Sequence, residues 1–317
     1  MFDAEFATAT ARVDAGALVC ALIGQGISRS LTPPMHEREA ACHGIDCSYL
    51  ALDVAADEID DVDLVGVLDR ARRAGLRGLN VTHPFKQQII AHLDELSDDA
   101  RRLGAVNTVV FDRAADGSTR TVGHNTDWSG FARNFELGFG AGSDDPVALG
   151  KVVQLGAGGA GSAVAYAMAA IGVGHLHLVD HDPARAHALA ETLRPMFPDV
   201  TITAGSTDRA VAELRDANGL VHATPIGMAA HPGMAVPAEV LRPDLWVAEV
   251  VYRPVVTELI ATARAAGART LTGEGMAVHQ AVDALALFAG ICPDAARMTR
   301  HIEDLIDAED AELRLPA

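Results

Sequence analysis

Lys86 is the first residue of the chain whose type and position suggest chemistry. It ends the stretch Asn80-Val81-Thr82-His83-Pro84-Phe85-Lys86, just after an apolar run. Lys86 and Lys151 are the only lysines among the chain's 25 Lys and Arg residues, and the others are arginines. A partly desolvated lysine can release its proton near neutral pH, whereas an arginine cannot. Lys86 is therefore a candidate for acid/base chemistry, although an isolated lysine is most often a solvated surface side chain.

The segments on either side would place Lys86 at the end of a strand. The apolar run 76–82 predicts a strand, and the pattern of residues 85–96 predicts a helix. Pro84 suits the first turn of that helix. We therefore expect Lys86 to project from a helix N-terminus beside a strand end.

Ser30 and Thr32 lie where a second polar group could form. The continuous apolar run 17–24 predicts a strand that is buried on both faces, and a helical pattern follows from residue 35. Thr32 suits the N-cap of that helix and Pro33 its first position. The hydroxyl and backbone donors gathered here suit a carboxylate, and plain helix capping is the alternative role.

A glycine-rich turn in the second half suggests a dinucleotide. The strand 151–155 runs into Gly156-Ala157-Gly158-Gly159-Ala160-Gly161, a helix follows, and the next strand ends at Asp180, 24 residues after Gly156. In this context the glycines let the backbone approach a pyrophosphate, and the acid can bind ribose hydroxyls. A tight turn without a ligand, or an S-adenosylmethionine site of a methyltransferase, is the alternative.

The acids at the end of that strand bear on the choice of cofactor. A phosphate on the ribose 2′-hydroxyl would face Asp180 and Asp182, and His181 is only a weak counter-charge at neutral pH. The sequence therefore favours NAD over NADP.

The remaining elements predict two α/β domains followed by terminal helices. Further strands are expected at 48–54 and 105–112, with an amphipathic helix at 57–75, so the sheet of the first half should be mostly parallel. The boundaries we expect are 1–125 for a substrate-binding domain, 126–274 for a dinucleotide-binding domain, and 275–317 for two helices that return to the first domain. That return would bring His279 and Gln280 near the interdomain cleft. Residues before the first strand are expected to form only a short, frayed extension.

Composition excludes several classes of partner. The formal charge of −18 opposes nucleic acids and anionic membrane surfaces. No apolar run is long enough to span a membrane, and the N-terminus does not resemble a signal peptide. The four cysteines form no CxxC pair, which favours reduced thiols in the cytoplasm. Cys42, His43 and Cys47 lack a second ligand cluster, so no metal is expected, and the chain could be a monomer or a homo-oligomer.

Seven ordered segments resemble the shikimate/quinate dehydrogenase family from about residue 18 to 305. They are Ser30-Leu31-Thr32-Pro33, Asn80-Val81-Thr82-His83-Pro84-Phe85-Lys86, Gly104-Ala105-Val106-Asn107-Thr108, Gly123-His124-Asn125-Thr126-Asp127, the glycine turn 156–163, Ala223-Thr224-Pro225-Ile226-Gly227-Met228 and Gly275-Met276-Ala277-Val278-His279-Gln280-Ala281. The resemblance implies an N-terminal substrate domain, a Rossmann-type NAD-binding domain and an active site in the cleft between them.

The resemblance also implies roles for individual residues. Lys86 and Asp127 would be the catalytic pair that oxidises a ring secondary alcohol of quinate or shikimate; whether Lys86 is the base or a charged donor stays open. The substrate would be bound by Ser30, Thr32, Asn80, Thr82, Asn107, Asp127, Tyr252 and Gln280. The dinucleotide would be bound by Gly156, Ala157, Gly158, Gly159, Ala160, Gly161, Asp180, Arg185, Thr224, Pro225, Met228, Val251, Gly275 and Met276.

Within that family the chain is most similar to the NAD-dependent quinate/shikimate branch, which acts mainly in catabolism. Thr32 stands where biosynthetic members usually have serine, and Asp180-His181-Asp182 replaces their Asn-Arg-Thr. His222, Glu249 and Ala277 depart from the usual Asn, Asp and Leu. An NADP-dependent or amino-substituted shikimate dehydrogenase, and a non-catalytic quinate-binding regulator, are the other possibilities.

Overall fold

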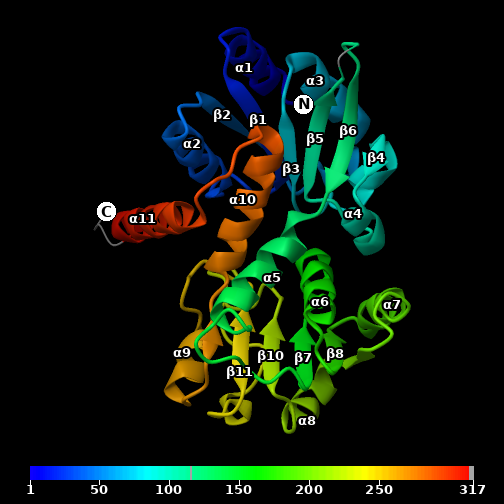
Figure 1. Cartoon of the computed structure of the whole chain (residues 1–317), viewed down its shortest axis with the longest axis vertical. Coiled ribbons are helices and arrows are strands. Elements are labelled where there is room, and N and C mark those ends of the chain that lie inside the picture. Colours follow the sequence, from blue (N-terminus) through cyan, green and yellow to red (C-terminus); the bar gives the residue numbers. More distant parts are fainter. Residues whose placement is uncertain (115, 314–317) are drawn as a thin grey trace. The chain divides into compact units, whose positions relative to one another are not determined.

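The computed structural model describes residues 1–114 and 116–313 of the protein. The chain forms two compact units, one made of residues 1–126 with 280–317 and the other of residues 127–279. Each unit contains a six-stranded sheet with helices on both faces (Figure 1). None of the described helices is long and apolar enough to cross a membrane.

The sheet of the first unit is mixed but mainly parallel. Its order is β2-β1-β3-β5-β6-β4, formed by β1 (Leu18–Gln25), β2 (Cys47–Val54), β3 (Gly78–Val81), β4 (Glu95–Leu96), β5 (Thr108–Arg113) and β6 (Thr119–His124). Strands β2 and β3 run parallel to β1, and β4 runs parallel to β6. Strand β5 is antiparallel to both of its neighbours, β3 and β6, and it forms a hairpin with β6.

Alternate residues of β1 face two different sets of helices. Val19, Ala21 and Ile23 belong to the core beneath α1 (Asp3–Asp14) and α3 (Leu64–Ala74). Cys20 and Leu22 instead cluster with residues of α10 (Glu274–Ala289). Both faces of β1 are therefore buried, as its continuous apolar run predicts.

The predicted N-terminal extension is wrong, because residues 3–14 form α1. Phe6 and Ala9 lie three apart on one face of this helix, and both are buried against the core. The helix predicted over 57–75 is shorter than expected. A 3₁₀ turn, η1 (Ile59–Asp61), precedes it, and α3 begins only after Asp63, whose carboxylate accepts from the Gly66 N–H at 2.9 Å.

The predicted helix over 85–96 is also absent. The His83–Pro84 bond is cis, and a turn leads into a short 3₁₀ helix, η2 (Gln88–His92), and then into β4. Asp94 exchanges hydrogen bonds with Thr121 of β6, including one of 2.8 Å from the Thr121 N–H to its carboxylate. This pairing holds the chain extended beside β6, so the helix cannot continue.

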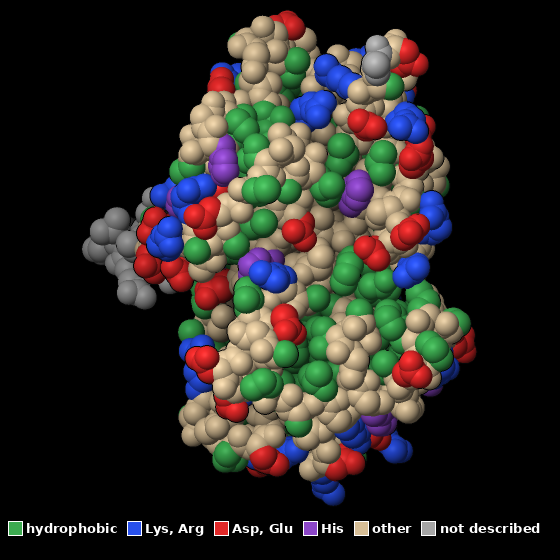
Figure 2. All heavy atoms as spheres, viewed as in Figure 1, with side chains coloured by type: hydrophobic (Ala, Val, Ile, Leu, Met, Phe, Trp, Pro, Cys, Tyr) green, Lys and Arg blue, Asp and Glu red, His purple; other side chains and the backbone are tan. Residues whose placement is uncertain are grey.

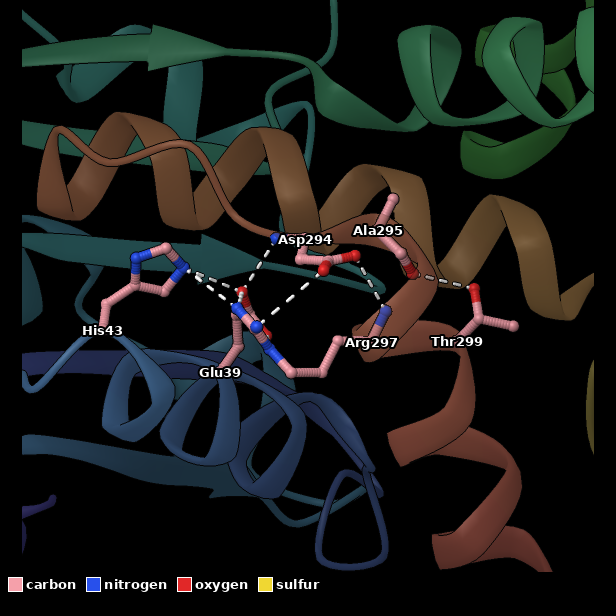
Figure 3. Close-up of polar contacts among 6 residues, drawn as sticks. All are labelled: Glu39, His43, Asp294, Ala295, Arg297 and Thr299. Atoms are coloured by element: carbon pink, nitrogen blue, oxygen red, sulfur yellow. Dashed lines mark hydrogen bonds and ion pairs between the residues drawn. The ribbon is translucent and has the colours of Figure 1, made fainter.

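A buried carboxylate joins two helices that are distant in sequence. Glu39 of α2 (Thr32–Cys42) accepts hydrogen bonds of 2.7 and 2.6 Å from the Arg297 guanidinium of α11 (Ala295–Leu313). Its carboxylate also accepts a hydrogen bond of 2.8 Å from the Asp294 N–H and lies 3.0 Å from Nε2 of His43 (Figure 3). The two charges offset each other's desolvation and hold the start of α11 against α2.

The sheet of the second unit is entirely parallel. Its order is β12-β11-β10-β7-β8-β9, from β7 (Lys151–Leu155), β8 (His175–Asp180), β9 (Thr201–Ser206), β10 (Gly219–His222), β11 (Trp246–Glu249) and β12 (Thr270–Leu271). Numbered within the unit, this is the 3-2-1-4-5-6 order of the Rossmann fold, in which ligands bind where the order reverses, between β7 and β10.

Apolar helices and aromatic side chains cover this second sheet. The helices are α5 (Thr126–Gly138), α6 (Gly159–Ile171), α7 (Pro183–Leu193), α8 (Ala210–Leu214) and α9 (Glu258–Ala265). Helix α6 is buried continuously from Gly161 to Ala169, which explains its Ala-rich sequence. Phe135 of α5 packs edge-on against Trp246 of β11, with ring centroids 5.2 Å apart.

Candidate functional site

A buried polar network lies at the ends of the strands in the first unit. Asn80 of β3 donates hydrogen bonds through Nδ2 to the Asn107 carbonyl at 3.1 Å and to the Thr108 hydroxyl at 2.9 Å. Its Oδ1 accepts from the Tyr49 hydroxyl. Because both amide hydrogens of Asn80 are engaged, any further bond that it makes must use Oδ1 as an acceptor.

Asn107 connects this network to the start of α5. Its Oδ1 accepts from the Thr126 N–H at 2.7 Å, and its Nδ2 donates to the Thr126 hydroxyl at 3.0 Å. The neighbouring Asn125 donates to the Ala105 carbonyl at 3.0 Å. These bonds fix the residues directly before Asp127, whose side chain is only 7% exposed.

The backbone of Lys86 is fixed next to the same network. The Lys86 carbonyl accepts a hydrogen bond of 2.8 Å from the N–H of Val106, which is the residue directly before Asn107. The side chain of Phe85 is fully buried and anchors the turn. The half-buried Lys86 side chain therefore leaves a rigid turn, although not the helix N-terminus predicted for it.

The loop that carries Ser30 is held by Asp53, an acid that no motif of the sequence indicates. Asp53, near the end of β2, accepts from the N–H groups of Ile27 at 3.1 Å and Ser28 at 3.0 Å. Helix α2 begins at Thr32 with Leu31 at its N-cap, so the prediction that Thr32 is the cap is wrong. Instead, the Ser30 hydroxyl accepts from the Thr32 N–H at 3.3 Å. The only sequence feature that could have indicated this role of Asp53 is the presence of an acid at a strand end beside a glycine-containing loop.

Close packing brings Thr82 next to β1. A Cβ atom on Gly24 would lie 2.2 Å from Cγ2 of Thr82, so only glycine allows this approach. The Gln25 N–H also donates to the His83 carbonyl at 2.9 Å. The loop after β1 and the Thr82–Lys86 turn are thus joined directly.

His36 of α2 is neutral at physiological pH. Its ring is fully buried and packs against the Tyr49 ring, with the centroids 4.8 Å apart and the planes tilted by 46°, and Nδ1 donates to the Thr32 carbonyl at 2.8 Å. Burial lowers the pKa of His36 to about 4, and the Thr32 carbonyl opposes this shift only in part. His36 therefore supports Tyr49, which bonds to Asn80, without adding a charge.

Gln280 lies in the part of α10 that belongs to the first unit and is half-buried. Further along this helix Phe288 packs on β3, since a Cβ atom on Gly78 would lie 2.0 Å from its ring. In the second unit Tyr252 is half-buried and Val251 buried just after β11, and Met228 is exposed after β10. Met276 is buried, and Gly275 is packed so closely on Asn134 that an added Cβ would lie 1.9 Å from its Oδ1.

The glycine turn of the second unit has the shape needed for a phosphate. Gly156 has a φ of 101°, and an added Cβ would lie 2.4 Å from the Ala223 carbonyl oxygen. A Cβ on Gly161 would lie 2.2 Å from the Gly156 oxygen, whereas Gly158 faces open space. Gln154 tightens the turn by donating to the carbonyls of Gly156 and Gly161 at 2.9 and 2.7 Å. The first N–H groups of α6, which lack acceptors within the helix, remain directed at this space.

Asp180 connects the glycine turn to the end of β8. Its Oδ2 accepts from the Ala157 N–H at 2.7 Å, and its Oδ1 accepts from the Asp182 N–H at 3.0 Å. Asp182 caps α7 through the Ala184 N–H at 3.0 Å. Arg185 is mostly exposed and lies 3.6 Å from the Asp182 carboxylate. The local charge is therefore dominated by two fixed carboxylates.

Charges elsewhere are dispersed. Acidic and basic side chains are interspersed on the face shown in Figure 2. Within residues 1–114 and 116–313, no three His, Cys, Asp or Glu side chains gather closely enough to hold a metal ion. His175 and His177 both contact the Thr203 hydroxyl, at 2.7 and 2.8 Å, as expected for strand packing.

The parallel sheet, the reversal of its strand order between β7 and β10, and the glycine turn after β7 define a dinucleotide-binding α/β protein with a second α/β unit. Comparison with known proteins narrows this class. The model of the shikimate dehydrogenase substrate-binding domain matches residues 22–109. A shikimate dehydrogenase (NADP+) of Streptomyces avermitilis is 52% identical over 90% of this chain and 94% of its own.

Two relatives from Corynebacterium carry a different cofactor in their names. A quinate/shikimate dehydrogenase (NAD+) of Corynebacterium efficiens is 47% identical over 89% of this chain and 96% of its own. The structure of quinate dehydrogenase from Corynebacterium glutamicum in complex with NAD superposes with a TM-score of 0.83, at 44% identity, over 91% of this chain and 99% of that one. The chain belongs to the shikimate/quinate dehydrogenase family of oxidoreductases, which confirms the resemblance drawn from its motifs.

Proposed function

We propose that the protein catalyses the NAD-dependent, reversible oxidation of a ring secondary alcohol of quinate, shikimate or both. The products are 3-dehydroquinate and 3-dehydroshikimate. The observation that carries this proposal is the Asn80–Asn107–Thr126 network, which fixes polar groups beside the rigid turn of Lys86. In this proposal the first unit binds the substrate and the second binds the cofactor.

Lys86 and Asp127 act on the hydroxyl that is oxidised. The hydroxyl proton is taken up as the carbon loses a hydride, so a group that accepts the proton or stabilises the alkoxide lowers the barrier. Lys86 suits either role because its backbone is fixed by the Val106 N–H and its side chain is half-buried. Asp127 follows directly after Thr126, whose backbone and hydroxyl are both held by Asn107.

The polar groups of the first unit bind the rest of the substrate. The loop ordered by Asp53 presents Ser30 and Thr32 to the substrate carboxylate. Asn80 accepts a ring hydroxyl through its Oδ1, because its amide hydrogens are already used. Thr82, Asn107, Tyr252 and Gln280 complete the set of side chains assigned to the substrate.

The second unit fits a dinucleotide. Gly156 and Gly161 allow the tight turn, and the open space in front of Gly158 leaves room for a pyrophosphate at the N-terminus of α6. A bound dinucleotide supplies the nicotinamide ring that accepts the hydride. Ala157, Gly159 and Ala160 line the same turn, and Asp180 is placed for the adenosine ribose.

The two acids at the end of β8, Asp180 and Asp182, support NAD rather than NADP. A 2′-phosphate would lie against Asp180, which is 6% exposed and held by two backbone N–H groups, and against Asp182. The relatives divide on this point, since the Streptomyces enzyme is named for NADP and the Corynebacterium enzymes for NAD. The carboxylates of Asp180 and Asp182 favour NAD, the cofactor for which the Corynebacterium enzymes are named.

Membership of an oxidoreductase family leaves the methyltransferase alternative without support. A quinate-binding regulator would not need the lysine and aspartate, yet both are present.

Purified protein should be assayed with quinate and shikimate, each with NAD and NADP, by the absorbance of the reduced nicotinamide. Turnover of either acid, faster with NAD, supports the proposal. Binding of these acids without turnover would favour the regulator.

A further inference from the structure

His222 and Glu249 end two neighbouring strands of the second unit, and their side chains bond to each other. They are register partners in β10 and β11, and each is 1% exposed. His222 Nδ1 lies 2.9 and 3.1 Å from the two carboxylate oxygens of Glu249. An ionised carboxylate can only accept, so Nδ1 carries the hydrogen of this bond.

Glu249 also holds the chain that follows β11. Its Oε1 accepts from the N–H groups of Val250 at 2.9 Å and Val251 at 3.0 Å. Its Oε2 accepts from the Thr257 hydroxyl at 3.2 Å, and Thr257 caps α9. One buried carboxylate thus fixes both ends of the segment that contains Val251 and Tyr252.

His222 holds the chain that follows β10 through its second nitrogen. Nε2 bonds to the Thr224 hydroxyl, whose oxygen also accepts from the Ile226 N–H at 3.3 Å. Thr224 in turn lies against the glycine turn, since a Cβ atom on Gly156 would be 3.1 Å from its Cγ2. The network therefore joins the segments after β10 and β11 and reaches the turn after β7.

The direction in which a dinucleotide would bind indicates a role for this network. With the pyrophosphate at α6 and the adenosine ribose at Asp180 after β8, the nicotinamide half must extend to the other side of β7. The segments on that side are those after β10 and β11. A buried pair of polar side chains is weak evidence for stability alone, so its position is the informative feature.

We propose that His222 and Glu249 are positioning residues that hold the segments 224–226 and 250–252 in the conformation that binds the nicotinamide half of the dinucleotide. This inference rests on the proposed function. It assigns His222 no contact with the substrate and no part in proton transfer.

Two substitutions separate the two bonds of His222. In His222→Asn the side-chain amide reaches the position of Nδ1 and keeps the Glu249 bond, but it loses Thr224. In His222→Gln the amide reaches the position of Nε2 and keeps Thr224, but it loses the short bond to Glu249. Thr224→Val removes the hydroxyl with almost no change in volume. His175→Asn and Thr203→Val are matched controls, because this pair bonds at 2.7 Å in the same sheet, with His175 at the amino end of β8.

The test is the dissociation constant of NADH, measured by titrating its fluorescence without substrate, together with thermal unfolding of each variant. We expect a rise of about tenfold in the dissociation constant for both His222 variants and for Thr224→Val, as for the loss of one hydrogen bond. The controls should stay within about twofold of the wild type.

Unchanged NADH affinity in folded His222→Asn and Thr224→Val variants would overturn the inference and leave the proposed function intact, even if the variants melt earlier. Absence of binding by the wild type to NADH and NADPH would overturn both. If His222 variants do not fold, Thr257→Val decides, because it removes a bond by which Glu249 holds the segment after β11, and Thr257 is not assigned to the dinucleotide.

Discussion

The N–H of Val106 donates a 2.8 Å hydrogen bond to the carbonyl of Lys86. Residue 107, next in the chain, is the asparagine whose side chain holds Thr126 just before Asp127. A short chain of backbone and amide bonds thus runs from the Lys86 carbonyl to Thr126, the residue directly before Asp127.

Two glycines of the turn after β7 should behave oppositely when changed to alanine. In Gly161→Ala the new Cβ would lie 2.2 Å from the Gly156 oxygen, so the turn must distort and the melting temperature should fall by several degrees. In Gly158→Ala the Cβ enters open space, so stability should stay unchanged while NADH affinity falls at least about tenfold. Calorimetry with NADH titration measures both. Normal NADH binding by Gly158→Ala would show that the pyrophosphate does not bind at this turn.

Cofactor preference should change when the charge after β8 is altered. His181→Arg combined with Asp182→Ser adds a cation and removes an anion, while serine still caps α7. The kcat/KM for NADP should rise by about tenfold or more, and that for NAD should change less. Steady-state kinetics with both cofactors provide the measurement. The matched control is Asp208→Ser, at an exposed acid beyond β9, which should alter neither value. If kcat/KM for NADP does not rise in this variant, the 2′-phosphate of NADP does not bind beside residues 181 and 182.

His36 should make the fold sensitive to mild acid. Its folded pKa of about 4 lies below the ordinary value of 6.5, so the unfolded chain binds a proton that the folded one does not. The free energy of unfolding should therefore fall as the pH drops from 6.5 to 4, by up to about 3 kcal/mol. His36→Phe keeps the ring contacts and should show a shallower decline in denaturant unfolding over this range. Parallel curves for both proteins would show that His36 does not contribute.

The buried Glu39 should contribute much more than an exposed pair between the same helices. Glu39→Gln weakens two short bonds to Arg297 and should cost about 2 kcal/mol in the free energy of unfolding. Asp304→Asn removes the exposed Arg38–Asp304 contact of 3.3 Å and should cost less than about 1 kcal/mol. Urea unfolding of both variants compares them directly. Equal losses would mean that the buried pair does not hold α11.

Local patterns predicted the second unit well. The apolar run of β7, its glycines and Asp180 are close in sequence, and each follows from a short-range rule. The first unit was harder, because Asp94 stops a helix by bonding to Thr121, and Glu39 pairs with Arg297 at the far end of the chain. The roles of Asp53 and His36 likewise depend on backbone groups that only the fold brings near. Periodicity does not encode such partners.

The kcat of Lys86→Met tests most directly whether Lys86 is catalytic. Methionine keeps the length of the side chain and removes its charge and proton, and Lys151→Met is the control, since Lys151 is paired with Glu213 and Asp216. We predict that kcat with quinate or shikimate falls by about a thousandfold or more in Lys86→Met, with a smaller change in KM, and by less than about twofold in the control. Near-normal turnover by Lys86→Met would contradict the account.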